Sequence, residues 1–390
     1  MIVVVSSPPR LTESEAIAGI QAVLDEAVAE DQFSGAVLLG KGGQVRFGRA
    51  SGLADRERGT PNTLQMRFRV GSMNKMFTGV AVLQLAEAGQ VELTAPLGEY
   101  LTGYPNRDVA AKATIHHLLT HTAGTGDIFG PKFREHRQEL RALGDYLRLY
   151  GDRGLEFEPG GRWQYSNYGF VLLGAVIEQV TGQTYYDYVT EHIYQPAEMT
   201  ATGSQPEDEA VPDLAVGYTK RLGRARPGRV RLGKAKWLPN TGTLPYRGTS
   251  AGGGYSTAED LNRFAQALLG HQLLSPDSTR LLITGKAGPD HGPPGARYAY
   301  GFLDQRDAEG NGPVGHDGGA PGMNGALRIY PKSGYVVIAL ANMDPPAASQ
   351  IAGWLGARIP GSRLGSVSGQ QGVQQSPCAS VPNQDVEDLD

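Results

Sequence analysis

The chain has 390 residues, of which 40% are hydrophobic, and its formal net charge at pH 7 is −4. This length and apolar content allow two or three domains with a large core. Charges of both signs are interleaved without a basic stripe, so nucleic acid is not an expected partner. No apolar run approaches the roughly 18 residues of a membrane-spanning helix, so no membrane span is expected. Cys378 is the single cysteine, which excludes disulfides and cysteine-built metal sites.

The first half of the chain predicts a hairpin followed by many helices. Thr12 and Glu15 form a capping box that predicts a helix with one apolar face. Two apolar segments flank Lys41-Gly42-Gly43 and predict a β-hairpin over residues 35–39 and 44–47. Helical periodicity then dominates up to about residue 201, and the expected helices are 72–88, 114–120, 135–150, 167–181 and 184–192.

After about residue 203 the pattern returns to strands. Residues 221–234 are rich in Gly and Arg and predict a loop or an edge hairpin. A capped helix is expected at 257–269 and a closing helix near 347–358, and the expected strands are 298–303, 326–330 and 335–341.

This order of elements predicts an α+β fold in which a helical domain is inserted into a sheet domain. We expect a discontinuous sheet domain made of residues 1–80 and 204–360, and a helical domain of residues 81–203. Residues 361–390 are rich in Ser, Gln, Gly and Pro, so we expect a disordered tail.

The segment Ser72-Met73-Asn74-Lys75 begins the longest amphipathic helix that we expect. A serine and a lysine three residues apart on a helix share one face, so the amine can touch the hydroxyl. A serine hydroxyl is a poor nucleophile until a neighbour takes its proton, and a helix N-terminus stabilises a developing oxyanion. The pair predicts a serine hydrolase that works through an acyl-enzyme. The alternative is a capping Ser72 with a solvated Lys75, but a first-turn cation is disfavoured and apolar neighbours follow it.

A second motif, Tyr165-Ser166-Asn167, precedes an apolar helix. A tyrosine at such a junction can project into a cleft, while Asn167 offers an amide to a substrate carbonyl. A phenol of pKa near ~10 acts as a base only if a cation such as Lys75 favours the phenolate. The alternative is a core tyrosine with an N-capping Asn167. A similar segment, Tyr104-Pro105-Asn106, lies in a turn with no helix expected after it and is set aside.

A third motif, His316-Asp317-Gly318-Gly319, stands before the strand pair 326–341. Glycines there let a substrate lie against the backbone, and the Gly319 N–H can contribute to an oxyanion hole. His316 is expected to line the cleft opposite Tyr165. The alternative is a glycine-rich hairpin with a surface histidine.

These three motifs together resemble the serine β-lactamase and penicillin-binding-protein-like superfamily. Serine–x–x–lysine, tyrosine–x–asparagine and histidine–x–glycine occur in the order typical of class C β-lactamases and family VIII carboxylesterases. The resemblance covers roughly residues 15–358 and includes the segments 114–124 and 251–261. It implies an antiparallel sheet flanked by helices and a mostly helical domain, with the cleft between them.

The resemblance also implies a role for each site residue. Ser72 would be the nucleophile, and Lys75 and Tyr165 would share the proton transfers. Asn167 would hold the substrate, and the backbone N–H groups of Ser72 and Gly319 would bind the oxyanion.

The third motif departs from that of class C β-lactamases, which have lysine–threonine–glycine there. Here His316, followed by the substrate-facing Gly318, replaces a permanent cation with a group that is mostly neutral at pH 7. A β-lactam carries a carboxylate that favours the cation, so we expect weak or no β-lactamase activity. Neutral esters suit His316 better.

Two other patterns suggest different chemistry. The segment Gly248-Thr249-Ser250-Ala251-Gly252 matches the nucleophile elbow of α/β-hydrolases, but no buried strand precedes it and no helix follows at once. We expect it to form a glycine-rich cleft wall.

His117 and His121 are spaced for zinc on a helix, but the glutamate of a zinc-protease motif is missing. Structural histidines are therefore expected, with no metal and no cofactor.

The predicted function is that of a carboxylesterase acting on a small-molecule ester. The alternatives are a β-lactamase or a D-amino-acid peptidase or amidase, a penicillin-binding protein that acylates without turnover, and an inactive scaffold. The first residues lack the basic and apolar stretches of an export signal. The sequence leaves the compartment open between the cytoplasm and, if an export signal was cropped, the periplasm or the outside of the cell. The oligomeric state does not follow from the sequence.

Overall fold

The computed structural model describes residues 11–220, 236–288 and 295–361. Its centre is a seven-stranded sheet of order β2-β1-β13-β12-β11-β10-β9, in which every neighbouring pair is antiparallel. The strands are β1 (Gly35–Lys41), β2 (Gln44–Ser51), β9 (Arg297–Tyr298), β10 (Leu303–Asp304), β11 (Val314–Ala320), β12 (Met323–Tyr330) and β13 (Tyr335–Ala341). The first and last parts of the chain therefore meet in one sheet, where β1 pairs with β13.

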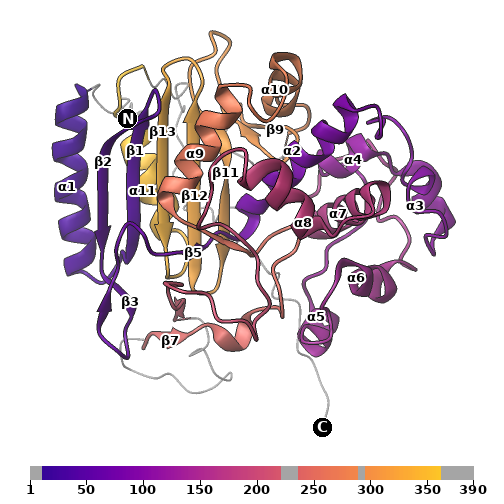
Figure 1. Ribbon diagram of the computed structural model, residues 1–390, viewed down its shortest axis with the longest axis horizontal. Helices are drawn as coiled ribbons and strands as arrows, with labels where there is room; N and C mark the ends of the chain where they lie inside the picture. The colour runs from indigo at the N-terminus through magenta and orange to yellow at the C-terminus, as the bar shows by residue number, and fades with distance from the viewer. Residues whose placement is uncertain (1–10, 221–235, 289–294, 362–390) are drawn as a thin grey trace, which may run out of the picture.

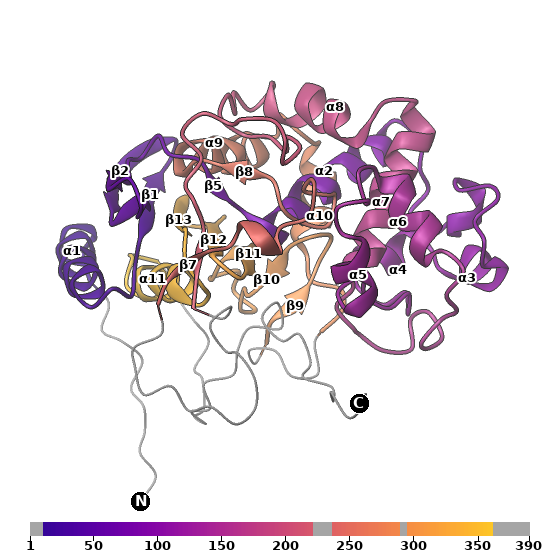
Figure 2. The ribbon, with the colours of Figure 1, turned by 90° about the horizontal axis from the view of Figure 1, so that it is seen from below.

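Helices cover both faces of this sheet (Figures 1 and 2). The helices are α1 (Glu13–Ala29), α2 (Asn74–Glu87), α3 (Arg107–Lys112), α4 (Ile115–Leu119), α5 (Pro131–His136), α6 (Leu143–Tyr150), α7 (Asn167–Thr181), α8 (Tyr185–Val189), α9 (Ala258–Leu269), α10 (Pro276–Ile283) and α11 (Ala347–Gly356). Figure 2 shows α9 on one face of the sheet and α11 on the other. Helices α3 to α8 gather beyond α2, at the side of the sheet where β9 and β10 lie.

Strict alternation along the central strands divides the core in two. In β13, Val336 and Ile338 belong to a large core that continues through α9 and α2 into the helical layer. Val337 and Ala339 face the opposite way, into a smaller core closed by α1 and α11. Among the described residues, no helix is long and apolar enough to cross a membrane.

The elements that the sequence predicted most accurately are those with strong local signals. The capping box of Thr12 and Glu15 is present at the start of α1. Helix α7 spans the predicted residues 167–181 and ends at Gly182, whose φ of 71° suits a left-handed cap. The predicted hairpin, the helix at 257–269 and the last strand are likewise confirmed.

Two predicted elements are wrong because tertiary contacts interrupt them, and the expectation that no helix follows Asn106 is also wrong. The single strand 298–303 is two short strands, β9 and β10, around Gly301, where a Cβ would stand 2.3 Å from the Lys75 carbonyl oxygen. The single helix 135–150 is α5 and α6, because Asp145 accepts the backbone N–H groups that precede α6. A short helix, α3, does follow Asn106, whose side chain caps it.

Other predictions fall on parts of the chain that the structure places differently or does not describe. The histidine–glycine motif lies inside β11, which forms an antiparallel hairpin with β12, so the hairpin part of the alternative is confirmed. The segment predicted at 221–234, and the predicted tail beyond residue 361, lie outside the described residues. The division into sheet and helical domains stays a prediction.

Helix α2 packs closely against the backbone before β10, and Gly79 makes this approach possible. A Cβ on Gly79 would lie 2.2 Å from the Tyr300 carbonyl oxygen. We predict that Gly79→Ala destabilises the protein by about 1–3 kcal/mol through overpacking, although alanine is the better helix former. Urea unfolding followed by circular dichroism measures the change. Gly353→Ala on α11 is the matched control, because its Cβ meets nothing within 4 Å; equal loss in both variants would contradict the prediction.

Candidate active site

Ser72 lies in a single 3₁₀ turn, η1 (Gly71–Met73), directly before α2 rather than on the α-helix itself. This turn is pressed against β11. A Cβ on Gly318 would stand 1.8 Å from the Val70 carbonyl oxygen, and one on Gly71 would stand 3.1 Å from the Gly319 nitrogen. The glycines of the third motif therefore let the backbone of β11 reach the backbone of Ser72. The Ser72 and Gly319 N–H groups are the candidates for an oxyanion hole.

Lys75 is fully buried, and the contacts of its amine include Asn167, Ala251 and Ser72. Nζ donates to Asn167 Oδ1 at 2.7 Å and to the Ala251 carbonyl oxygen, and it lies 3.3 Å from Ser72 Oγ. The first two partners can only accept. If the amine is neutral, these two acceptors can take its two protons, and a lone pair can then be directed at Ser72 Oγ. This geometry can remove the serine proton, and a solvated Lys75 is excluded.

Tyr165 lies beside the same amine. Its ring centroid is 4.8 Å from Lys75 Nζ, and its ring is 6.5 Å from that of His316 and 4.3 Å from that of His121. The tyrosine is half-buried at the wall of the site. The structure thus brings Ser72, Lys75, Tyr165 and His316 together from three separate parts of the chain.

Asn167 is the first residue of α7, and the cap is Ser166, so the N-capping alternative for Asn167 is wrong. Both the oxygen and the nitrogen of its side-chain amide form hydrogen bonds with other side chains. Oδ1 accepts from Lys75, while Nδ2 donates to Asp127 Oδ2 at 3.1 Å and the backbone N–H donates to Asp127 Oδ1 at 3.1 Å. In this structure Asn167 therefore holds the lysine rather than presenting its amide to a substrate carbonyl.

Asp127 is a site residue that the sequence analysis missed. It fixes which end of the Asn167 amide faces Lys75, because a carboxylate accepts only from the NH₂ end. Burial raises the pKa of Asp127, although its hydrogen bonds act in the opposite direction. Asp127 follows Gly124-Thr125-Gly126 in an irregular segment, and no spacing or periodicity there marks it.

His316 is buried in β11 with 1% of its surface exposed, so the surface-histidine alternative is wrong. Nδ1 contacts the Asp317 carbonyl oxygen at 2.5 Å, and Nε2 lies 3.0 Å from the Tyr298 hydroxyl. A carbonyl accepts only, so Nδ1 carries the proton and Nε2 accepts from Tyr298. Burial, and then the nearby charge of Lys75, lower the pKa of His316 to about 4. The imidazole is therefore neutral at pH 7.

Neither Asp317 nor its partner Arg328 places a positive charge on this wall of the site. Asp317 projects from the opposite face of β11, as alternation along a strand requires. There Arg328 on β12 binds both of its carboxylate oxygens. The arginine charge is thus paired on the side of the sheet away from His316.

The two alternative motifs have structural roles. Ser250 is fully buried and donates to the Phe170 carbonyl oxygen at 2.8 Å, while the next residue, Ala251, supplies the carbonyl that holds Lys75. His121 accepts from the Ser166 N–H, and His117 accepts from the Thr114 N–H, and burial lowers the pKa of both histidines. Within the described ranges, no group of three or more potential metal-ligating side chains is clustered.

The chain is similar to known proteins over most of its length. The family model described as Beta-lactamase matches residues 20–359. Esterase EstB of Burkholderia gladioli is 31% identical over 73% of this chain and 79% of its own. The crystal structure of a penicillin-binding protein from Bacillus halodurans superposes with a TM-score of 0.73 and 33% identity, covering 84% of this chain and 98% of that one.

A third similar protein is a D-stereospecific amidohydrolase from Streptomyces sp., whose structure has a TM-score of 0.70 and 28% identity over 86% of this chain and 97% of its own. These neighbours share the antiparallel sheet and flanking helices that the resemblance implied. The family match covers the three motifs and all the strands of the central sheet. The chain therefore belongs to the β-lactamase family and is a serine hydrolase of the β-lactamase and penicillin-binding-protein superfamily.

Proposed function

We propose that this protein is a carboxylesterase that hydrolyses small, uncharged acyl esters through an acyl-enzyme on Ser72. The observation that carries the proposal is the buried, neutral His316 at the position where class C β-lactamases have a lysine. The similarity to esterase EstB supports the same chemistry.

The catalytic cycle begins with the Lys75 lone pair. As Ser72 Oγ attacks the ester carbonyl carbon, Lys75 takes the hydroxyl proton, and the oxyanion is bound by the N–H groups of Ser72 and Gly319. The bond to the alcohol breaks, and the alcohol oxygen receives a proton from Lys75 or from Tyr165 beside it. Water then attacks the acyl carbon and gives its proton to the same pair. The bond to Ser72 Oγ breaks and the serine is protonated again.

Asn167 and Asp127 position the base, Lys75. Asp127 holds the Asn167 amide, and Asn167 Oδ1 and the Ala251 carbonyl hold two of the lysine protons. A lysine surrounded by fixed acceptors does not rotate away when the serine proton arrives. The base is thereby oriented before substrate binds, which is the condition for efficient general-base catalysis.

The neutral wall at His316 determines which substrate charge the site prefers. A carboxylate placed there would lose its hydration next to an imidazole that carries no charge, which is costly without a paired cation. An ester with an uncharged acyl group has no such cost. β-Lactams, which carry a carboxylate, are therefore expected to acylate Ser72 slowly.

The first prediction from the proposed function concerns the identity of the nucleophile. Ser72→Ala should lower kcat for p-nitrophenyl acetate by roughly 10⁴-fold or more, as loss of a nucleophile does in related chemistry. Ser250→Ala is the matched control. It removes one buried hydrogen bond, worth about 1 kcal/mol of stability, and should leave most of the activity. The opposite pattern would restore the nucleophile-elbow model.

The second prediction concerns pH and stability. The pKa of His316 is lowered from 6.5 to about 4 in the folded protein, so below pH 6.5 the unfolded state binds the proton more readily. Its stabilising contribution is complete above pH 6.5 and is lost as pH falls toward 4, by about 3 kcal/mol in total. Calorimetric melting of wild type and His316→Gln between pH 7 and 4 measures it. We expect a flatter profile in the variant; parallel profiles would contradict a buried neutral His316.

The third prediction separates the esterase from the other members of its superfamily. Intact mass and steady-state turnover are measured together for p-nitrophenyl esters, a penicillin and a D-amino-acid amide. We expect fast turnover of the esters, slow turnover of the penicillin and no lasting acyl adduct from the esters. A stoichiometric adduct without turnover would indicate a penicillin-binding protein. Preferential turnover of the D-amino-acid amide would indicate an amidase.

A further inference from the structure

Helix α4 ends on a histidine whose backbone has a conformation that usually belongs to glycine. His121 has a φ of 60°. Its N–H donates to the Leu118 carbonyl oxygen at 3.4 Å, and the Thr122 N–H donates to the His117 carbonyl oxygen at 2.9 Å. Glycine is preferred in this helix-ending pattern, because a Cβ is strained at such a φ. Helix α2 ends in the same pattern with Gly89, whose φ is 68°. The imidazole at the end of α4 is therefore not required by the helix itself.

His121 forms hydrogen bonds with the chain on both sides of Tyr165. Its carbonyl oxygen accepts the Gln164 N–H at 2.8 Å, and its Nδ1 accepts the Ser166 N–H at 3.1 Å. Tyr165 lies in an irregular segment before α7, so no repeating backbone pattern fixes its place. The two peptide groups that flank the tyrosine are thus bonded to one residue.

The ring of His121 also contacts the tyrosine side chain. The two ring centroids are 4.3 Å apart and the planes are inclined by 36°. The same imidazole lies 4.3 Å from the ring of Tyr298, whose hydroxyl is bonded to His316. His121 is buried, and burial lowers the pKa of its imidazole well below the usual range. The ring is therefore neutral at pH 7, and its Nδ1 is able to accept.

Asn167, the other site residue of this segment, is anchored separately. It is the first residue of α7, and both its backbone N–H and its side-chain Nδ2 donate to Asp127. Ser166 Oγ caps the same helix. Removal of the His121 ring is therefore expected to act on Tyr165 more than on Asn167.

We propose that His121 is a positioning residue that holds Tyr165 beside Lys75, so that the phenol protonates the departing alcohol. The bond from the acyl carbon to the alcohol oxygen breaks with its electron pair on that oxygen. The oxygen takes the Tyr165 proton, and the phenolate takes the proton that Lys75 received from Ser72. The inference rests on the proposed function, because this transfer takes place only if esters acylate Ser72.

The leaving group shows whether this proton is delivered. p-Nitrophenolate is a stable anion and leaves with little help, whereas phenolate, whose acid has a pKa near ~10, gains more from a proton. p-Nitrophenyl acetate and phenyl acetate give the same acyl-enzyme, so kcat/KM compares the steps up to release of the alcohol. His121→Gly keeps the left-handed turn and removes the ring. We expect it to lower kcat/KM at least about tenfold for phenyl acetate and at most about threefold for p-nitrophenyl acetate.

A conservative variant and a double-mutant cycle test whether His121 acts through Tyr165. Asparagine tolerates a left-handed φ, and its Oδ1 can accept the Ser166 N–H in place of Nδ1. His121→Asn should therefore keep kcat/KM for both esters within about threefold of wild type. In a Tyr165→Phe background, His121→Gly should change kcat/KM for phenyl acetate less than about twofold, because the group that it positions is already absent.

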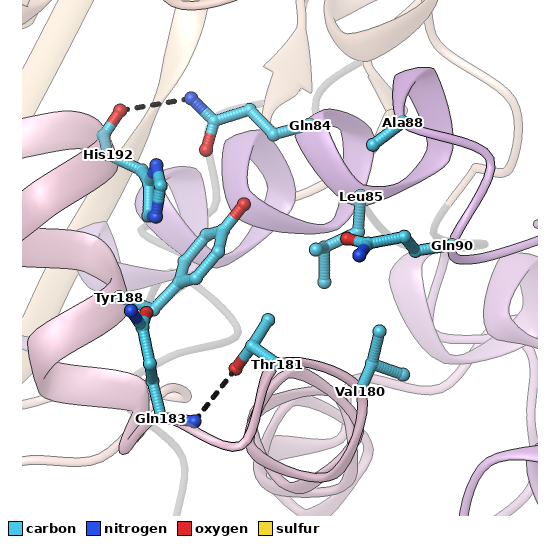
Figure 3. Close-up of a pocket in the computed structure, with 9 residues that line it drawn as sticks. All are labelled: Gln84, Leu85, Ala88, Gln90, Val180, Thr181, Gln183, Tyr188 and His192. Atoms are coloured by element: carbon cyan, nitrogen blue, oxygen red, sulfur yellow. Dashed lines mark hydrogen bonds between the residues drawn. The ribbon is translucent and has the colours of Figure 1, made fainter.

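Two controls separate positioning from a general loss of structure. His117→Ala removes a ring that accepts the Thr114 N–H at 3.3 Å, the same kind of bond at the other end of α4. Thr181→Val removes an acceptor of the Gln183 N–H at a pocket of about 480 Å³ where α2 and α7 end (Figure 3). That position lies roughly 21 Å along α7 from Asn167. Both controls should leave the ratio of the two kcat/KM values unchanged, even where the melting temperature falls.

Melting temperature shows whether each variant is folded. His121→Gln, which fills more of the space but carries its oxygen one bond further out, takes the place of His121→Gly if that variant does not fold. The inference is overturned if both esters lose rate equally, if the loss persists in the Tyr165→Phe background, or if His121→Asn is as slow as the glycine variant. A control that shifts the ratio as His121→Gly does would also overturn it. A wild-type protein that hydrolyses neither ester would instead overturn the proposed function, and this inference with it, so the two failures are distinguishable.

Discussion

Burial of the Lys75 amine is the constraint on which the site depends. An amine removed from water is costly unless its protons are all directed to acceptors. Here the acceptors come from α7 and from the glycine-rich segment at Ala251, and the serine comes from the turn before α2. The helical layer and the glycine-rich segment must therefore both be in place before the amine is satisfied. A fold that meets this condition also aims the amine at the Ser72 hydroxyl.

The opposite wall of the site is formed where the backbone of β11 lies close to the serine turn, and His316 in this wall is uncharged. Gly318 and Gly71 allow β11 to lie against the serine turn, since a side chain at either position would collide with backbone or crowd it. His316 on the same strand is buried with its single proton directed at a carbonyl oxygen. The result is a wall whose N–H groups can bind an oxyanion and whose buried histidine carries no charge. We propose that a wall without a cation favours neutral acyl groups over carboxylates.

The sequence predicted those parts of the protein that local chemistry controls. Helix α7 has a serine cap and a left-handed glycine end, and β13 is an uninterrupted apolar run, so both were located correctly. The three motifs led to Ser72, Lys75, Tyr165 and His316, and the structure brings these four side chains together. Their chemical roles stay proposals.

What sequence analysis missed depends on contacts between distant segments. Asp127 and the Ala251 carbonyl belong to irregular segments without periodicity, yet they orient the amide and the amine of the site. Gly301 divides an expected strand because the Lys75 backbone passes close to it. The most direct measurement of the central claim is the rate at which a fluorophosphonate labels the protein, with the modified residue located by peptide mass. The account predicts labelling of Ser72 and a rate at least about 100-fold lower in Lys75→Met. A label on another serine, or an unchanged rate in the variant, would contradict it.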